Sequence, residues 1–306
     1  MTGHELIVRP QHSRVKARKR STRPALPPVQ EAPAAADDGH VPQSLACLAV
    51  VPIYLRTPEE LDVLLRALVS LRETAPQAEV LVVDDRSPAQ ELVDLIEIAC
   101  GELAIELHRR PVNGGFSRAV NVGLQRALDE GRDALLVNAD IEFHEHGWLE
   151  PMLARTDTTG ALAAVVGARL LYPNGLLQHA GVYYSTLHRF WSHRFAFGPP
   201  DLPEALQPCR CPVTGALQLI RHECLAEVGL YDERFRMGWE DVDYCLRVFA
   251  SGRECIYEPA ACATHAESLF RRHRGEGQDN WESQSWQTLN EKYAATDLSA
   301  FMPVYE

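Results

Sequence analysis

Short apolar runs alternate with amphipathic segments through the first half of the chain. Four runs have the length and composition of buried parallel strands: Leu45–Ile53, Glu79–Val83, Ile105–His108 and Ala134–Val137. Apolar residues recur at helical spacing in the three segments between them, which begin at Thr57, Ser87 and Ser117. The alternation predicts an α/β fold in which a mostly parallel, Rossmann-like sheet carries helices on both faces.

Two of these helices have recognisable start signals. Thr57–Glu60 combines a potential N-cap, Pro at the first helical position and Glu three residues after the cap, which is the pattern of a capping box. Ser87–Gln90 repeats the arrangement with Gln in place of Glu. We therefore expect Thr57 and Ser87 to be N-caps.

The pattern is less regular after Val137. Short strands are expected at Val165–Ala168, Gln218–Ile220 and Glu254–Tyr257, with a hairpin at the turn Asn174-Gly175. Helices that end before a Gly are expected at His222–Val228 and Glu240–Ala250. The segment 185–212 is rich in aromatic residues, Pro and His, and is predicted to be a long loop.

Composition divides the chain into three parts. Residues 1–44 hold a basic run, Arg14–Arg23, and a Pro- and Ala-rich stretch without apolar periodicity. This composition predicts a disordered tail, and a weak tether to anionic lipid is the second interpretation. Residues 45–270 are the predicted α/β domain, and residues 271–306 are a polar extension with an expected helix around Asp279–Lys292.

Charge and composition exclude several classes of protein. The chain has 30 Lys+Arg against 42 Asp+Glu and a formal net charge of -12, which makes it a poor platform for nucleic acid. Apolar runs fall short of the ~20 residues that cross a bilayer. We expect a cytoplasmic protein, at most peripheral at the inner face of the membrane. The eight cysteines include no C-x2-C pair, which argues against structural zinc. The oligomeric state is left open.

Acidic residues follow two of the predicted strands. Asp84 and Asp85 end one strand, and Asp140 closely follows another. Such strand ends can meet at one crevice of the sheet, where the carboxylates of an acidic protein repel one another unless a cation lies between them. A divalent metal that also binds a diphosphate would serve. The alternative is that each Asp caps the loop after its strand.

Two further segments are candidates for binding or activating a substrate. Asn113, Gly114 and Gly115 lie between a predicted strand and a helix, where backbone can approach an anion closely. Glu240 and Asp241 lie where a loop meets an amphipathic helix, a position that suits a general base. Acids in a first helical turn also compensate the helix dipole, and that interpretation stays open.

Taken in order, these segments resemble the family 2 glycosyltransferases of the GT-A fold over about residues 46–268, and especially their bacterial rhamnosyltransferase-like branch. The matching segments are Val51–Tyr54, Val83–Ser87, Asn113–Ser117 with Asn121–Gly123, Asn138–Asp140, Gly215-Ala216, Val228–Glu233, Glu240–Asp243 and His265. The resemblance implies an inverting enzyme of cell-surface polysaccharide biosynthesis. It would move one sugar from a nucleotide-diphosphate sugar to a hydroxyl of a glycan, lipid-linked or other acceptor.

The resemblance also implies roles on the donor side. Pro52 and Tyr54 would line the nucleotide base and ribose. Asp85, with Asp84 beside it, would accept a hydrogen bond from the base. The turn of Asn113, Gly114 and Gly115, together with Arg118, would approach the nucleotide and its diphosphate.

The metal and the general base are implied in the same way. Asp140 would bind Mg2+ or Mn2+, and His265 would complete the metal shell. Asp241 would be the general base, with Glu240 orienting it or holding the acceptor. The D-x-D motif reads Asn138-Ala139-Asp140, so an amide replaces its first carboxylate and weakens the predicted metal site.

Three residues are candidates for the acceptor side. Trp239 precedes the acidic pair, Trp191 lies in the predicted long loop, and His179 follows the hairpin. Contact with an acceptor sugar is one interpretation of these side chains. For the aromatic loop that holds Trp191, the other interpretation is that it covers the core of the domain.

Two other classes of protein share parts of this pattern. A catalytically degenerate GT-A domain would bind a nucleotide sugar or a protein partner without turnover; Asn138 favours it, and the intact Glu240-Asp241 pair argues against it. A sugar-1-phosphate nucleotidyltransferase would need a Gly-rich loop with Arg and Lys after the first strand. The segment Pro52–Arg56 does not have that composition, so this class ranks lower.

Overall fold

The structure is a computed structural model of the 306-residue chain, and it describes residues 47–266, 280–300 and 304–305. The predicted tail at residues 1–44 lies outside the described residues, so its disorder and its lipid tether stay predictions. The division of the chain at residues 45 and 271 is likewise untested. Among the described residues, no helix is both long and apolar enough to cross a membrane.

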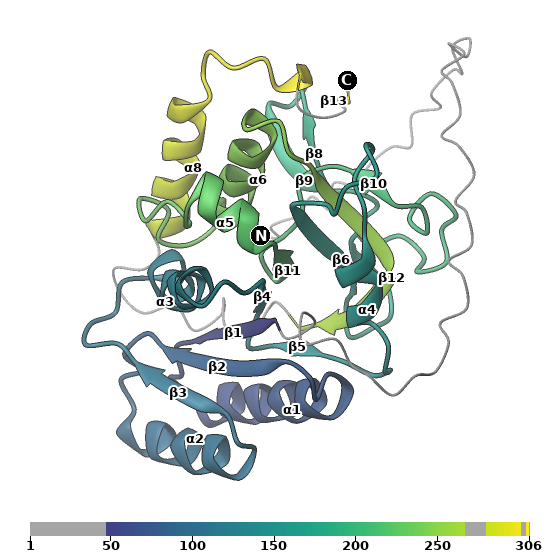
Figure 1. Ribbon diagram of the computed structural model, residues 1–306. Helices are drawn as coiled ribbons and strands as arrows, with labels where there is room; N and C mark the ends of the chain where they lie inside the picture. The colour runs from purple at the N-terminus through teal and green to yellow at the C-terminus, as the bar shows by residue number, and fades with distance from the viewer. Residues whose placement is uncertain (1–46, 267–279, 301–303, 306) are drawn as a thin grey trace, which may run out of the picture. The chain divides into compact units, whose positions relative to one another are not determined.

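The first half of the described chain has the predicted alternation. Strands β1 (Leu48–Ile53), β2 (Glu79–Asp84), β3 (Glu106–Arg109) and β4 (Ala134–Val137) alternate with helices α1 (Pro58–Thr74), α2 (Gln90–Glu102) and α3 (Phe116–Asp129). The four strands are parallel, in the spatial order β3-β2-β1-β4. Strands β1, β2 and β3 lie in the lower half of Figure 1, above α1 and α2. The Rossmann-like unit is therefore confirmed.

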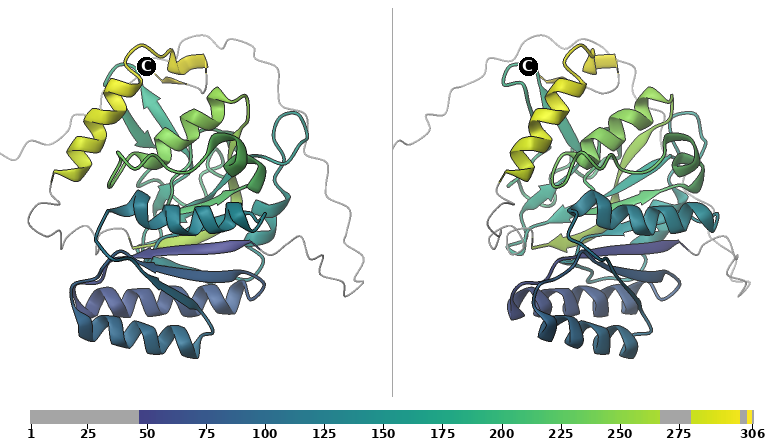
Figure 2. Two further views of the ribbon diagram at one scale, coloured as in Figure 1. Left: turned by 60° about the vertical axis from the view of Figure 1, so that its left-hand side comes forward. Right: turned by 90° about the vertical axis from the view of Figure 1, so that its left-hand side faces the viewer.

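Both faces of this parallel sheet are buried, because apolar side chains point to both sides of each strand. On β1, Ala49, Val51 and Ile53 belong to the core that α1 and α2 cover, whereas Leu48 and Val50 belong to the core beneath α3. Figure 2 shows α1 and α2 on one side of the sheet and α3 on the other. The prediction of helices on both faces is confirmed.

The second half of the chain extends the same sheet. Beyond β4 come β11 (Leu217–Ile220), antiparallel to β4, then β6 (Val165–Leu171), β12 (Cys255–His265) and β10 (Cys209–Arg210). Two short strands, β5 (Ile141–Glu142) and β7 (Leu177–His179), pair with β12 and β6. The described part of this half also contains helices α4 (Leu149–Ala154), α5 (His222–Val228), α6 (Glu240–Ala250) and α8 (Trp281–Lys292), and a short 3-10 helix at Leu298–Ala300.

The segment 185–212, predicted to be one long loop, is partly sheet, and the prediction is wrong there. Strand β9 (Phe190–His193) pairs with β8 (Val182–Ser185), and β13 (Val304–Tyr305) adds to the other edge of β8. Strand β10 also falls in this segment. These strands are only two to four residues long. They are too short for an alternating pattern to be recognised among Pro and His residues.

The predicted cap at Thr57 is confirmed, and the one at Ser87 is wrong. Thr57 Oγ1 accepts a hydrogen bond from the Glu60 N–H, and Glu60 Oε2 accepts one from the Thr57 N–H, both at 3.3 Å. Ser87 accepts the N–H of Leu55 at 2.7 Å and donates its hydroxyl to Asp84 Oδ1 at 2.5 Å. Ser87 therefore ties two strand ends together, and α2 begins further along the chain.

Gly123 sets the distance between α3 and β1. A Cβ atom at this position would lie 2.3 Å from Cγ2 of Val50, closer than any normal contact. We expect Gly123→Ala to push α3 away from the sheet and to lower the free energy of unfolding by about 1–3 kcal/mol. In α2, a Cβ at Gly101 would meet nothing within 4 Å. Gly101→Ala should therefore raise the free energy of unfolding by about 0.5–1 kcal/mol. Urea denaturation of both variants is the measurement, and equal effects would contradict the argument.

Candidate active site

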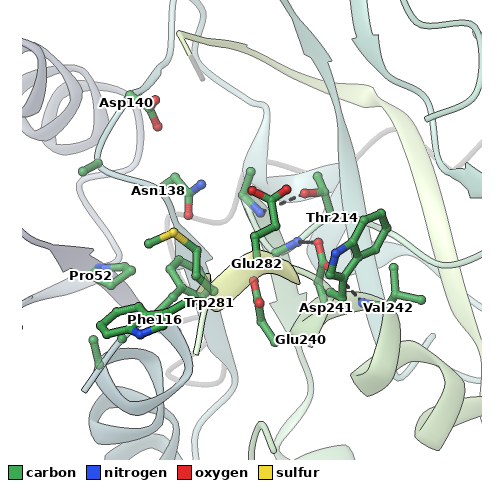
Figure 3. A pocket seen from close by; sticks show the side chains of 18 of the residues that line it. Pro52, Phe116, Asn138, Asp140, Thr214, Glu240, Asp241, Val242, Trp281 and Glu282 are labelled. Carbon is green, nitrogen blue, oxygen red and sulfur yellow. Dashed lines mark hydrogen bonds between the residues drawn. The ribbon is translucent and has the colours of Figure 1, made fainter. Parts of the chain in front are cut away.

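A cavity of about 440 Å³ opens at the carboxyl ends of β1, β2 and β4 (Figure 3). This edge includes the point where the strand order reverses, with β1 lying between β2 and β4, and such crevices bind ligands in open α/β sheets. Besides these strand ends, the walls come from β9, from the loop before β11, from the start of α6, and from helix α8 (Trp281–Lys292).

The structure brings most of the predicted site residues to this cavity. Those that line it are Pro52, Tyr54, Asp85, Asn113, Gly115, Asn138, Asp140, Trp191, Trp239, Glu240, Asp241 and His265. Four predicted residues are not part of its lining: Asp84, Gly114, Arg118 and His179.

The two adjacent acids at the end of β2 have different surroundings. Asp84 is fully buried; its Oδ1 accepts the N–H of Ser87 at 2.8 Å, and its Oδ2 lies 3.1 Å from Nε of Arg109. Asp84 therefore fixes the turn after β2, in agreement with the alternative interpretation of a loop cap. Asp85 instead lines the cavity.

Asp85 holds the glycine turn in place. Its carboxylate accepts the N–H of Gly114 at 3.0 Å and that of Gly115 at 2.7 Å, and it pairs with Arg110. Burial raises the pKa of Asp85, while these hydrogen bonds and the Arg110 charge oppose the shift. Both carboxylate oxygens of Asp85 are thus engaged by the protein itself, and its contact with a nucleotide base stays a prediction.

The glycine turn also packs closely against protein backbone. Gly115 has a φ of +91°, and a Cβ there would lie 2.4 Å from the carbonyl oxygen of Arg236. The N–H of Phe116, the first residue of α3, donates to the same carbonyl at 2.7 Å. Arg118 pairs with Glu233 at 3.0 Å near the surface. The contacts of Gly115 explain this glycine by packing, and the predicted approach of the turn to a diphosphate is untested.

Asp140 and His265 meet on one side of the cavity although they lie far apart in the sequence. Strands β5 and β12 are paired, and His265 lies opposite Ile141 in this pair. Asp140, the residue before Ile141, therefore lies beside the His265 imidazole. Asp140 Oδ1 lies 3.1 Å from Nε2 of His265, and both residues are at most 7% exposed. Gln178 completes the arrangement, because its Oε1 lies 2.6 Å from His265 Nδ1 and its amide donates to the His265 carbonyl at 3.2 Å.

This hydrogen bonding fits a bound cation. Gln178 Oε1 can only accept, so the proton of a neutral His265 ring lies on Nδ1 and the lone pair of Nε2 faces Asp140. The buried Oδ1 of Asn138 has no hydrogen-bond partner among the described residues. Carboxylate and amide oxygens suit Mg2+ or Mn2+, and an imidazole nitrogen favours a transition metal such as Mn2+ over Mg2+. Within the described ranges, no group of three or more His, Cys, Asp or Glu side chains could hold a metal.

Glu240 and Asp241 lie on the other side of the cavity from Asp140 and Asn138, as Figure 3 shows. They are the first two residues of α6. Asp241 Oδ2 accepts the N–H of Gly215 at 2.9 Å, and its Oδ1 accepts the N–H of Val242 at 2.8 Å. The Asp241 carboxylate is thus held in a fixed position while it lines the cavity.

The predicted acceptor residues differ in position. Trp239 precedes α6 and lines the cavity. Trp191 also lines the cavity; it is 3% exposed and packs against Tyr184.

His179 is fully buried behind the cavity wall. Its Nε2 accepts the N–H of Thr214 at 3.4 Å, and its Nδ1 lies 2.8 Å from Nδ1 of His193. Burial and the neighbouring His193 lower the pKa of His179, which keeps the ring neutral.

Sequence reasoning missed several residues that line the cavity, above all two in α8. Trp281 and Glu282 belong to the polar extension that was assigned no role, and both line the cavity. Figure 3 shows Glu282 between the Asn138 side and the Asp241 side. The available signal was a pair of Trp residues, Trp281 and Trp286, on an otherwise polar helix.

The fold and the cavity together define a glycosyltransferase of the GT-A type. Among solved structures, the chain is similar to the crystal structure of GalNAc-T7 with UDP, GalNAc and Mn2+, with a TM-score of 0.57. That match has 19% sequence identity and covers 73% of this chain and 44% of the other. At this identity the likeness shows the fold alone.

The chain belongs to glycosyl transferase family 2, whose family model matches residues 49–203. It is 31% identical over 220 residues to the O-antigen biosynthesis protein RfbC of Myxococcus xanthus, a match that covers 68% of this chain and 17% of that protein. It is 27% identical to the N-acetylglucosaminyl-diphospho-decaprenol L-rhamnosyltransferase of Mycobacterium tuberculosis, over 50% of this chain and 56% of that enzyme. The predicted family is confirmed, and the second relative is in keeping with the predicted branch.

Proposed function

We propose that the chain is an inverting glycosyltransferase that moves a single sugar from a nucleotide-diphosphate sugar to a hydroxyl of a glycan, lipid-linked or other acceptor. One observation carries this proposal: the Asp140–His265 pair and the Asp241 carboxylate lie on opposite sides of one cavity. A leaving group held on one side and a base on the other permit direct displacement with inversion.

Asp140 and His265 are the proposed ligands of Mg2+ or Mn2+, with the Asn138 amide oxygen beside them. Such an ion, when bound, neutralises negative charge on a departing diphosphate. The GalNAc-T7 structure contains Mn2+ and UDP, which supports this assignment. Gln178 would keep the His265 ring in the tautomer that offers Nε2 to a metal.

The nucleotide is proposed to lie along the end of β1. Pro52 and Tyr54 line that wall of the cavity, and Asn113 adds a buried Oδ1 that has no hydrogen-bond partner in the part of the chain described. An unsatisfied buried oxygen is costly unless a ligand donates to it. Asp85 contributes by fixing the turn that carries Asn113.

Asp241 is the proposed general base. Its two backbone hydrogen bonds aim the carboxylate without neutralising it, so it can still take a proton from an acceptor hydroxyl. Glu240 and Trp239 would hold the acceptor next to this base. Trp191 would contribute an apolar wall.

The relatives support a narrower proposal for the sugar that is transferred and for the product into which it is built. An O-antigen biosynthesis protein and a rhamnosyltransferase support transfer of a hexose or deoxyhexose into a cell-surface polysaccharide. Because the chain spans only 17% and 56% of these two proteins, their complete activities do not carry over.

A degenerate domain that binds a nucleotide sugar without turnover is the second candidate. Asn138 favours it, because an amide replaces the first acid of the D-x-D motif.

A donor screen separates the two candidates. We expect the full chain with Mn2+ to bind at least one of UDP-glucose, UDP-N-acetylglucosamine, GDP-mannose and dTDP-L-rhamnose, seen as a rise in melting temperature. We also expect slow hydrolysis of the bound donor, measured as released nucleoside diphosphate. Binding without hydrolysis or transfer would favour the degenerate domain, and no binding of any donor would contradict both candidates.

A further inference from the structure

Helix α8 is fixed to the helix that carries Asp241. Lys292 Nζ pairs with Asp243 at 2.6 Å and with Asp232 at 3.0 Å, and the Tyr293 hydroxyl lies 2.9 Å from Asp243 Oδ1. Asp243 is fully buried in α6 and also binds Arg247 at 3.0 Å. Because the Asp243 side chain is buried, its charge-assisted contacts with Lys292 restrict the position of α8 against α6. Glu282, at the other end of α8, therefore has a defined position relative to Asp241.

Residue Trp286 of α8 supports an aromatic surface inside the cavity. Its ring centre lies 4.8 Å from that of Trp239 and 5.4 Å from that of Phe190, and Trp239 and Phe190 meet edge to face at 5.9 Å. Trp239 and Phe190 line the cavity, and Phe190 is 47% exposed. Aromatic rings left exposed in a cavity offer an apolar face for a ligand to stack on.

Trp239 has two further features typical of a binding position. Its φ is +71°, a left-handed conformation that is unfavourable for a bulky residue and is often found at functional sites. Its indole Nε1 is buried and has no hydrogen-bond partner among the described residues. An indole N–H can only donate, so an acceptor such as a sugar hydroxyl oxygen would satisfy it.

The charges at this end of the cavity are negative. Glu240, Asp241 and Glu282 all line it. Arg56 is the single Lys or Arg among the described lining residues, and it pairs with Glu60 at 2.7 Å. Carboxylates accept hydrogen bonds from hydroxyls, but they repel another carboxylate or phosphate.

We propose that α8 completes the acceptor site, and that this site takes a neutral pyranose and rejects an anionic sugar. Phe190 and Trp239 stack against the C–H face of the ring, Trp286 keeps both in place, and Glu282 accepts a ring hydroxyl and selects against negative charge. This inference rests on the proposed function, because the pyranose is the acceptor of that transfer.

Saturation-transfer NMR on the full chain tests the site without a donor. The probes are the methyl glycosides of glucose, galactose, mannose, rhamnose and N-acetylglucosamine, with methyl β-D-glucuronide as the anionic probe. We expect at least one neutral glycoside to receive saturation on its ring C–H protons, and the glucuronide to receive roughly fivefold less. No saturation of any neutral glycoside, or equal saturation of the glucuronide, would overturn the proposal.

Two variants and one control test whether α8 causes the binding of neutral glycosides and the discrimination against the glucuronide. Glu282→Gln should raise the glucuronide signal towards that of the neutral probe, although Glu240 and Asp241 keep part of the preference. An unchanged preference would refute the role of Glu282. Trp286→Ala should lower the melting temperature, because Trp286 packs against the core, and should reduce the neutral signal at a temperature where the variant is still folded. Glu282→Gln keeps the test valid if Trp286→Ala does not fold. Phe197→Ala is the matched control, because this ring is 69% exposed and is not part of the cavity lining.

The donor screen keeps the two proposals separate. Hydrolysis of a nucleotide sugar without binding of any neutral glycoside would overturn this inference and leave the proposed function standing. Binding of neutral glycosides without any binding of nucleotide sugars would overturn the proposed function. The pyranose site at α8 would then stand, but not as the acceptor site of that transfer.

Discussion

Asp241→Asn is expected to lower the rate of sugar transfer by roughly 10²–10⁴-fold, the usual contribution of a general base. The amide keeps the volume of the carboxylate but cannot take a proton from the acceptor hydroxyl. Affinity for the donor should change little, because the proposed diphosphate site at Asp140 and His265 lies on the other side of the cavity. Transfer rate and donor affinity are measured on the same preparation.

A purely structural role for Asp241 makes a different prediction. Its carboxylate accepts N–H groups from Gly215 and Val242, and an amide can accept only on its oxygen. Both accounts therefore predict a loss of stability of about 1 kcal/mol, and the rate alone separates them. Asp62→Asn, an exposed acid of α1, is the control that should change neither quantity. A destabilised Asp241→Asn enzyme with nearly full activity would rule out the base.

Removal of divalent metal is expected to reduce transfer to the background rate, and added Mn2+ should restore it. Asp140→Ala should abolish Mn2+ binding in the presence of UDP, measured by calorimetry. Gln178→Leu removes the acceptor for His265 Nδ1–H and should weaken Mn2+ binding by about 10–100-fold. Calorimetry reports binding whether or not the variant is active.

Full activity in excess chelator would contradict the metal assignment. Loss of activity in Asp140→Ala with unchanged Mn2+ affinity would assign Asp140 another role. His144→Ala is a suitable control, because this exposed imidazole hydrogen-bonds to Thr264 at 2.9 Å and does not line the cavity.

The parts of the fold that local sequence determines were predicted well. Both halves of the capping box at Thr57 are present in the structure, and β4 has the predicted bounds. Ser87 shows the limit of such signals. Its sequence context fits an N-cap, but the strand ends at Leu55 and Asp84 compete for its hydroxyl and N–H groups, and these contacts depend on the assembled sheet.

Strand β12 shows what non-local pairing adds. A short strand was predicted at Glu254–Tyr257, whereas β12 runs from Cys255 to His265. Its second part pairs with β6 beyond an irregularity between Glu258 and Cys262. Register across two distant strands cannot be read from the pattern of either strand.

The residues of the candidate site also divide into those that local sequence predicts and those that only the folded chain brings to the cavity. Motif residues such as Asp140 and Asp241 could be predicted because each lies at a strand or helix end with a recognisable neighbourhood. Trp281 and Glu282 could not, because nothing in a polar helix indicates which cavity it will cover. His179 was a candidate for the acceptor side but is fully buried, because Gln178 and His179 alternate along β7 and only Gln178 of the two lines the cavity.

The interior position of β12 has a consequence during protein synthesis. Strand β12 lies between β10 and β6 in the sheet, yet 83 residues, 172–254, separate the end of β6 from the start of β12. At roughly 5–20 residues per second, a ribosome needs about 4–17 s to add them. For that interval the nascent β6, with the apolar run Val165–Val166, lacks the partner along one edge, and an open strand edge can pair with another nascent chain. Slow synthesis across residues 172–254 should therefore favour aggregation of the growing chain, and a chaperone that covers the β6 edge should prevent it.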